Sequence, residues 1–325
     1  GFDTFTSKEF MNVLQTTENG WAKDEILTQH IMEAMDTSAQ EDFVFTVSVQ
    51  GHGNYPETQL IENPKIMVKG IEDEALKNKW EYYVNQVYEM DQFVGDLIKA
   101  VEARKEPSVV VFYGDHLPTM GLKAEDLKSR YLYNTNYVIW DNVGLQKQDK
   151  NIPAYQLMSE VLNRLDIHSG TVFNYHQQRK GTKNYLSDLE LLQYDILYGK
   201  QYVYNNHPPI TEGHMVMGIR DVSLSSIVPQ LSSGYSLYGE NFTKYSRVYV
   251  NGEKQKSSFL NNTRINLSET ELQDGDVIQV GQVGSSDTIF RMSDKYIYQN
   301  GQLVKQEGTA TDKDKSWVDQ EYDVK

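Results

Sequence analysis

The sequence predicts an α/β domain with a largely parallel sheet flanked by helices, followed by a small all-β sandwich. Two solid apolar runs, residues 42–50 and 109–113, alternate with helical patterns, which is typical of strands buried on both faces. After about residue 205 the pattern changes to short alternating strands between turn signals. The 325 residues suffice for one large and one small domain.

The helices of the first part are indicated by the spacing of apolar residues. This spacing predicts helices within residues 1–40, over about 74–104 and over 153–167. The longest of them carries one continuous apolar stripe, made of Tyr83, Val87, Met90, Val94, Leu97 and Val101. These helices supply the layers that cover the predicted sheet.

Strands are predicted at residues 42–50, 109–113 and 134–140. The first ends in a glycine-rich loop, and the second is stopped by Gly114. In open parallel sheets, ligands bind at the carboxyl ends of the strands. A functional site is therefore expected in the two loops that follow residues 42–50 and 109–113.

The second part of the chain shows the signals of antiparallel hairpins. Asn-Gly pairs at 251–252 and 300–301 predict tight turns between alternating segments. A polar linker and a polar tail flank this region. The predicted division is an α/β part over 1–205, a linker over 206–218, a β-sandwich over 219–305 and a tail over 306–325.

Composition excludes several classes of protein. The net charge of −15 argues against a nucleic-acid binder, which needs a basic surface, and against docking on anionic lipid. The absence of cysteine removes disulfides, thiolate metal sites and cysteine nucleophiles. No apolar run approaches the ~20 residues of a membrane span. The opening residues resemble neither a natural start nor a signal peptide, so we expect an excised or processed piece.

The sharpest local motif is Asp115-His116, directly after a predicted buried strand. A carboxylate and an imidazole supply an oxygen and a nitrogen ligand to a divalent cation. Gly114 permits the sharp turn that would aim both side chains at one ion. The alternative is an aspartate that caps a helix and a histidine in a surface groove.

A second motif surrounds His52, which lies between Gly51 and Gly53. The two glycines let the backbone and the imidazole approach a small anion closely. A plain turn with an exposed histidine is the alternative. Asp91 and Tyr55 are weaker candidates that would hold the site through hydrogen bonds, whereas a solvated acid is the ordinary interpretation of Asp91.

In their order along the chain, five stretches resemble the lipoteichoic acid synthase-like sulfatases, phosphoglycerol transferases of the alkaline phosphatase superfamily. They are GFDTF, GWAKDEIL, FTVSVQGHGNYP, YYVNQVYEMDQFVGDLI and VVVFYGDHLP. The resemblance covers roughly residues 1–205. The β region is similar, more vaguely, to Ig-like or IPT/TIG-like modules.

The resemblance implies a role for each motif. Asp115 and His116 match a family Asp-His pair that binds Mn²⁺, with Mg²⁺, Ca²⁺ or Zn²⁺ as alternatives. His52 matches a histidine of the substrate pocket, although Asn54 stands where the close family form often has proline. The nucleophile and a further ligand lie upstream in the family, so no catalytic nucleophile is expected in this chain and the fragment alone is expected to be inactive.

The function implied is metal-dependent transfer or hydrolysis of phosphoglycerol at the bacterial cell surface, as in lipoteichoic acid synthesis. The implied substrate is an anionic phospholipid or glycolipid. The implied location is the extracellular face of the cell membrane, with the anchoring segments outside this sequence. The β module could contact cell wall or protein. Two alternatives stay open: a sulfatase or phosphodiesterase of the same superfamily, and a non-catalytic cell-surface binding protein.

Overall fold

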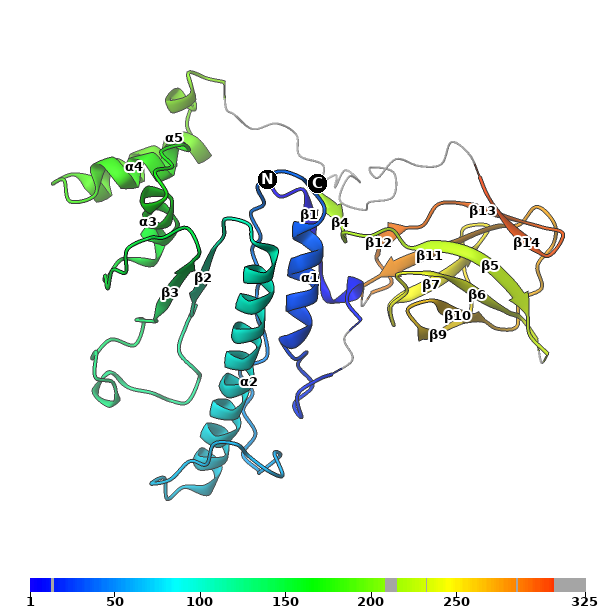
Figure 1. The fold of residues 1–325 in the computed structure, drawn as a ribbon, viewed down its shortest axis with the longest axis horizontal. Coiled ribbons are helices and arrows are strands. Elements are labelled where there is room, and N and C mark those ends of the chain that lie inside the picture. Colours follow the sequence, from blue (N-terminus) through cyan, green and yellow to red (C-terminus); the bar gives the residue numbers. More distant parts are fainter. Residues whose placement is uncertain (13–14, 208–214, 232, 285, 307–325) are drawn as a thin grey trace. The chain divides into compact units, whose positions relative to one another are not determined.

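The computed structural model describes residues 1–12, 15–207, 215–231, 233–284 and 286–306 (Figure 1). The chain divides into two compact units. The first unit combines residues 1–103, 118–132 and 213–325, and the second combines residues 104–117 and 133–212. The 3-10 turns are η1 (Lys8–Phe10), η2 (Ala124–Asp126), η3 (Ala154–Gln156) and η4 (Tyr202–Tyr204).

Two of the predicted helices of the first unit are present, as α1 (Glu25–Met35) and α2 (Glu74–Arg104), the long teal helix of Figure 1. The helical pattern over residues 7–15 forms only the 3-10 turn η1 within the described residues. Of the predicted stripe on α2, Leu97 and Val101 are buried and the other members are half-buried. Polar side chains share this buried face. Glu81 and Asn85 bind the backbone of residues 65–68, which explains why they are buried.

The predicted strand over residues 42–50 is not formed. The segment is extended but has no strand partner among the described residues. Phe43, Phe45 and Val47 are 61%, 55% and 66% exposed. An apolar, β-branched run favours a pleated strand, but the strand exists only where a second backbone accepts its ladder of hydrogen bonds.

The second unit contains the strands β2 (Val109–Tyr113) and β3 (Tyr137–Asp141). It also holds three helices: α3 (Leu157–Arg164), α4 (Thr171–Arg179) and α5 (Tyr185–Leu197). Both strands were expected, but they pair antiparallel, which corrects the expectation of a largely parallel sheet. Parallel strands need a long crossover, usually an α-helix, and the connection from β2 to β3 carries only η2.

Parallel pairing within the described residues is confined to β1 (Thr4–Phe5) and β4 (Val216–Met217). Thr4 faces Val216 in this pair, so the start of the chain lies beside the beginning of the β-rich region. Within the described part of the chain, no helix is both long and apolar enough to cross a membrane.

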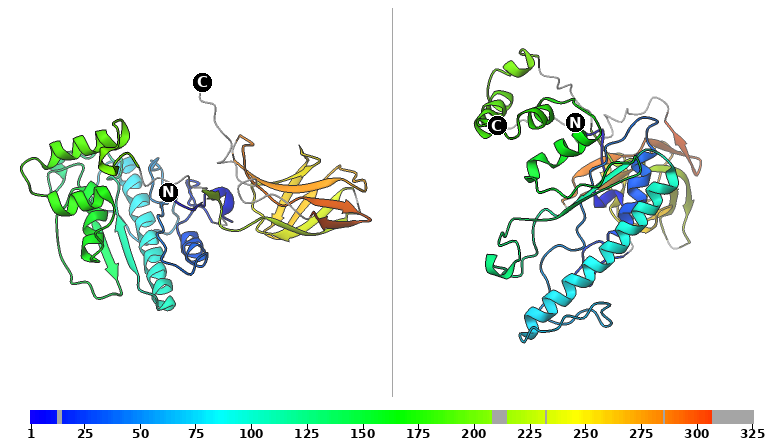
Figure 2. Two further views of the ribbon diagram at one scale, coloured as in Figure 1. Left: turned by 90° about the horizontal axis from the view of Figure 1, so that it is seen from above. Right: turned by 60° about the vertical axis from the view of Figure 1, so that its left-hand side comes forward.

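Residues 223–305 form the expected antiparallel strands, arranged in two sheets (Figure 2). One sheet has the order β5-β6-β10-β9, and the other has the order β14-β13-β11-β7-β8, with β12 paired to β11. The strands are β5 (Ser223–Pro229), β6 (Tyr235–Glu240), β7 (Ser246–Val250), β8 (Glu253–Lys254), β9 (Ser257–Asn261), β10 (Arg264–Leu267), β11 (Val277–Val283), β12 (Ile289–Met292), β13 (Tyr296–Gln299) and β14 (Gln302–Lys305).

The two sheets of this β module share one apolar core. Leu237 and Ile265 from one sheet and Val248 and Ile278 from the other are 0% exposed and belong to the same cluster. Alternation along each strand sends every second side chain into this core.

Candidate metal and substrate site

Asp115 and His116 lie in the turn that follows β2. The amide of Gly114 donates to the carbonyl of Asn136 at 3.1 Å, which continues the β2–β3 ladder by one step. The chain then turns, and Oδ1 of Asp115 accepts a hydrogen bond from the amide of His116 at 2.8 Å. Both side chains are exposed. The turn therefore presents a carboxylate and an imidazole side by side.

The hydrogen bonds of His116 decide which ring nitrogen is available. Its Nδ1 lies 2.9 Å from the carbonyl oxygen of Leu117. A carbonyl can only accept, so Nδ1 carries the proton and, in the neutral ring, Nε2 keeps a free lone pair. This is the arrangement in which a backbone carbonyl orients a metal-binding histidine.

The spacing of the donor atoms suits one shared ion. Nε2 of His116 lies 3.6 Å from Oδ2 of Asp115. Two ligands each ~2.1 Å from a metal at a tetrahedral angle are about 3.4 Å apart. Asp115 and His116 thus fit two positions around a divalent ion. No cluster of three or more ligating side chains (His, Cys, Asp or Glu) occurs within the described residues.

His52 is exposed in a loop of the first unit. Its amide donates to the carbonyl of Val49 at 3.0 Å, and its ring packs edge-on against Trp21 with ring centres 5.0 Å apart. A Cβ at Gly53 would lie 3.1 Å from Oγ1 of Thr119, so glycine permits a close approach to residues 118–120. The indole and this contact fix where the imidazole is presented.

Asn54 gives the loop a conformation that proline cannot adopt. Its φ of 69° is left-handed, whereas proline is held near −65°. The side chain of Asn19 donates to the carbonyl of Asn54 at 2.5 Å and holds this geometry. The replacement of the family's proline by Asn54 therefore goes with a left-handed backbone conformation at this position.

Tyr55 supports the same loop. Its hydroxyl donates to the carbonyl of Gly51 at 3.0 Å, and its ring packs edge-on against Tyr83. Burial raises the pKa of Tyr55 to about 12, so the hydroxyl stays protonated and acts as a hydrogen-bond donor. Asp91 is exposed on α2, and no hydrogen bond or ion pair engages its carboxylate within the described part of the chain.

A buried polar network that the sequence did not indicate lies beneath the loop. Asp24 is 2% exposed and Gln50 is 1% exposed. The carboxylate of Asp24 accepts from the Ser48 hydroxyl at 2.6 Å, and the amide of Asp24 donates to Oε1 of Gln50 at 2.8 Å. Gln50 in turn donates to Gln86 at 3.0 Å. Burial raises the pKa of Asp24, and the bond from Ser48 opposes that shift.

The motif residues thus fall into two groups. Asp115 and His116 belong to the second unit, whereas His52, Tyr55 and Asp91 belong to the first. Trp21 and Asp24 were missed as site-supporting residues, although both lie in the GWAKDEIL stretch already singled out. That all of these residues serve one site stays a prediction.

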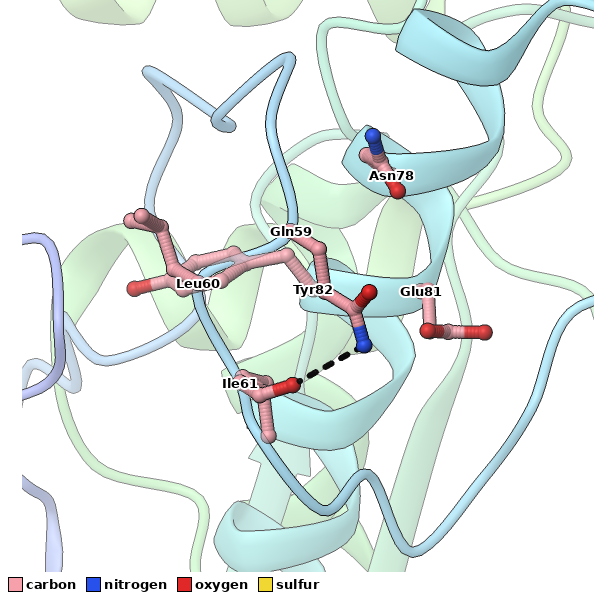
Figure 3. A pocket seen from close by; sticks show the side chains of 6 residues that line it. All are labelled: Gln59, Leu60, Ile61, Asn78, Glu81 and Tyr82. Carbon is pink, nitrogen blue, oxygen red and sulfur yellow. Dashed lines mark hydrogen bonds between the residues drawn. The ribbon is translucent and has the colours of Figure 1, made fainter.

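A small hollow beside α2 is too small for a ligand. Figure 3 shows Gln59 and Ile61 of the preceding loop against Asn78, Glu81 and Tyr82 of the helix. Its volume is about 10 Å³, room for a single water at most.

Comparison with known proteins gives one family and one curated relative. The "Putative cyclic beta-1,2-glucan modification protein" of Rhizobium meliloti (strain 1021) is 28% identical over 246 residues, which cover 62% of this chain and 38% of that protein. The chain therefore spans well under half the length of this relative. No solved structure matches at a significant level. The pattern of the Sulfatase family matches residues 1–167, just over half of the chain, and the protein therefore belongs to the Sulfatase family, within the alkaline phosphatase-like superfamily.

Proposed function

We propose that the protein takes part in metal-dependent transfer or hydrolysis of phosphoglycerol groups at the bacterial cell surface, as in lipoteichoic acid synthesis. Members of its superfamily use a divalent metal ion. The observation that carries the proposal is the Asp115-His116 pair, with Nε2 of His116 free and 3.6 Å from the carboxylate. Mn²⁺ is the proposed ion, and Asp115 and His116 are its proposed ligands.

A divalent ion bound there would neutralise charge on the phosphoryl oxygens and favour an ionised nucleophile. The residues of this chain would hold the ion and orient the two histidine rings of the site. The carbonyl of Leu117 fixes the ring of His116, and Trp21 fixes the ring of His52. His52 would bind a non-bridging oxygen or protonate the leaving group.

The proposed substrate and location rest on the resemblance of the five sequence stretches to the lipoteichoic acid synthase-like sulfatases. The donor would be an anionic phospholipid or glycolipid on the extracellular face of the membrane. The Rhizobium relative is named for modification of a cyclic β-1,2-glucan, so a carbohydrate is the proposed acceptor. The β module is the proposed contact with the cell wall.

The test compares two exposed Asp-His pairs in the second unit. Asp115 pairs with His116, and Asp166 lies 2.9 Å from His168. The assay uses membranes from cells that express the intact protein, supplied with Mn²⁺ and labelled phosphatidylglycerol. In this assay, Asp115→Asn should lower the rate of glycerol phosphate release by at least ~10²-fold. Asp166→Asn should leave release unchanged.

Two results would contradict the proposal. One is normal release by Asp115→Asn. The other is a wild-type protein that hydrolyses an aryl sulfate but releases no glycerol phosphate, which would favour a sulfatase. Binding of Mn²⁺ to each purified variant, followed by electron paramagnetic resonance, separates loss of the ion from loss of the fold.

A further inference from the structure

The first unit contains a polar cleft whose lining includes none of the motif residues. Its volume is about 500 Å³, within the range of small-ligand sites. The N-terminal segment and α1 line one part, and residues of the β module line the other. Asp115, His116 and His52 are not among its lining residues.

Buried hydrogen bonds fix the floor of this cleft. The Thr243 hydroxyl, which is 1% exposed, donates to the carbonyl of Glu9 at 2.7 Å. Gln282, also 1% exposed, bonds to the Thr243 hydroxyl at 3.3 Å. Phe10 packs so tightly on Gly218, whose φ is 77°, that a Cβ there would overlap the ring. The N-terminal segment is therefore built into the β module.

The cationic side chains and the histidine that line the cleft are already paired. Lys23 binds Glu89 at 2.9 Å. Arg220 and His30 both contact Glu33, at 3.3 and 3.0 Å. Burial lowers the pKa of His30, so the imidazole is neutral near pH 7. The cleft thus offers an anion no uncommitted cation.

Three of the polar side chains that have no hydrogen-bond partner within the described part of the chain are neutral amides, beside the carboxylate of Glu25 and the hydroxyl of Thr6. Among the described residues, no hydrogen bond engages the side chains of Asn12, Gln15 or Asn262, all of which line the cleft. A primary amide supplies two donors and an acceptor, which matches a hydroxyl that both donates and accepts. Phe10 and Ile26 add apolar surface to the same lining.

We propose that this cleft binds a neutral glycan segment, a ligand rich in hydroxyls with apolar ring faces and without charge. The inference rests on the proposed function in that the glycan would be the acceptor. An anionic headgroup is the competing ligand, and the paired cations disfavour it.

The experiment measures binding to the whole 325-residue chain by calorimetry, with chelator present so that no metal contributes. The neutral probes are a linear β-1,2-linked gluco-oligosaccharide and laminarihexaose, and the anionic probe is glycerol phosphate. Gln15→Ala and Asn262→Ala should each raise the Kd for a neutral probe by about 3–10-fold. Both positions are exposed, so the fold should survive, as circular dichroism would show.

Gln92→Ala is the matched control, since Gln92 is exposed on α2 and lies outside the cleft. It should leave the Kd unchanged, as should Asp115→Asn. Absence of binding by either neutral probe at ~10 mM would overturn the proposal, and so would tighter binding of glycerol phosphate. Equal Kd values for wild type, Gln15→Ala and Asn262→Ala would also overturn it. Glycan binding by this chain, with no glycerol phosphate release in the membrane assay of the intact protein, would refute the proposed function and leave the cleft assignment standing.

Discussion

The buried imidazole of His176 makes the free energy of unfolding depend on pH. It is 4% exposed, and its Nδ1 lies 2.7 Å from the hydroxyl of Tyr185. Burial lowers the pKa of His176, and burial also lowers the pKa of His30. Below about pH 6.5 the unfolded chain therefore binds protons that the folded protein does not. The contribution of these two imidazoles to the free energy of unfolding should be constant above that pH and should fall as the pH drops further.

Urea unfolding at pH 7.5 and at pH 5.5 measures this loss. In His176→Gln the loss between the two pH values should be smaller than in wild type, because one low-pKa group is gone. His168→Gln is the control, since His168 is exposed and its pKa is raised by Gln177 and Asp166. In His168→Gln, the drop in the free energy of unfolding between pH 7.5 and pH 5.5 should be no smaller than in wild type. A His176→Gln variant with the full wild-type loss would contradict the assignment.

Among the residues of the candidate site, only contacts between neighbours in the sequence could be predicted from the sequence. Asp115 and His116 meet because one follows the other after a strand that ends at Tyr113. Trp21 and His52 are 31 residues apart in the sequence, and no local sequence pattern predicts the contact between their rings. The same is true of Asp24 and Gln50, which are joined only by the folded backbone.

Asn85 makes helix α2 the anchor of an extended segment. Its Oδ1 accepts from the amides of Lys65 and Ile66 at 2.8 and 3.0 Å, and its Nδ2 donates to the carbonyl of Ile66 at 2.8 Å. Asn85→Ala would remove these three partly buried hydrogen bonds. The free energy of unfolding should fall by about 1–3 kcal/mol.

Chemical denaturation checks this value, with Gln92→Ala on the exposed face of α2 as the control. The control should change the free energy of unfolding by less than about 0.5 kcal/mol. A loss in Asn85→Ala no larger than in the control would show that water replaces the amide without cost.

Whole elements were predictable where their own sequence sets their contacts. The 3.6-residue period of α2 and the hairpin signals of the β module needed no distant information. The run over residues 42–50 has equally strong strand propensity, yet strand formation depends on a partner that no local pattern supplies. The direction of β3 against β2 likewise depended on the connection between them, which lacks a crossover helix.

At the level of the whole molecule, two compact units should unfold as two transitions. Leu237 lies in the core of the β module in the first unit, and Val161 is buried in α3 of the second. Each truncation to alanine removes core contacts. The free energy of unfolding of the unit concerned should therefore fall by about 2–5 kcal/mol for the leucine and by somewhat less for the smaller valine. The effects should be separable because the units are distinct.

Scanning calorimetry provides the measurement. Leu237→Ala should lower the temperature of one transition, and Val161→Ala should lower that of the other. A single transition shifted by both variants would show that the chain unfolds as one cooperative body.

Pairing of β1 with β4 has a consequence for biosynthesis. On the ribosome, Val216 is made 212 residues after its partner Thr4. At about 5–20 residues per second, the first strand waits roughly 10–40 s for its neighbour. Residues 133–212 of the second unit are complete before then, so that unit is free to fold first. Thr4 and Phe5 spend this interval as nascent chain without their strand partner, exposed to chaperones and to the secretion machinery of any cell that exports the protein.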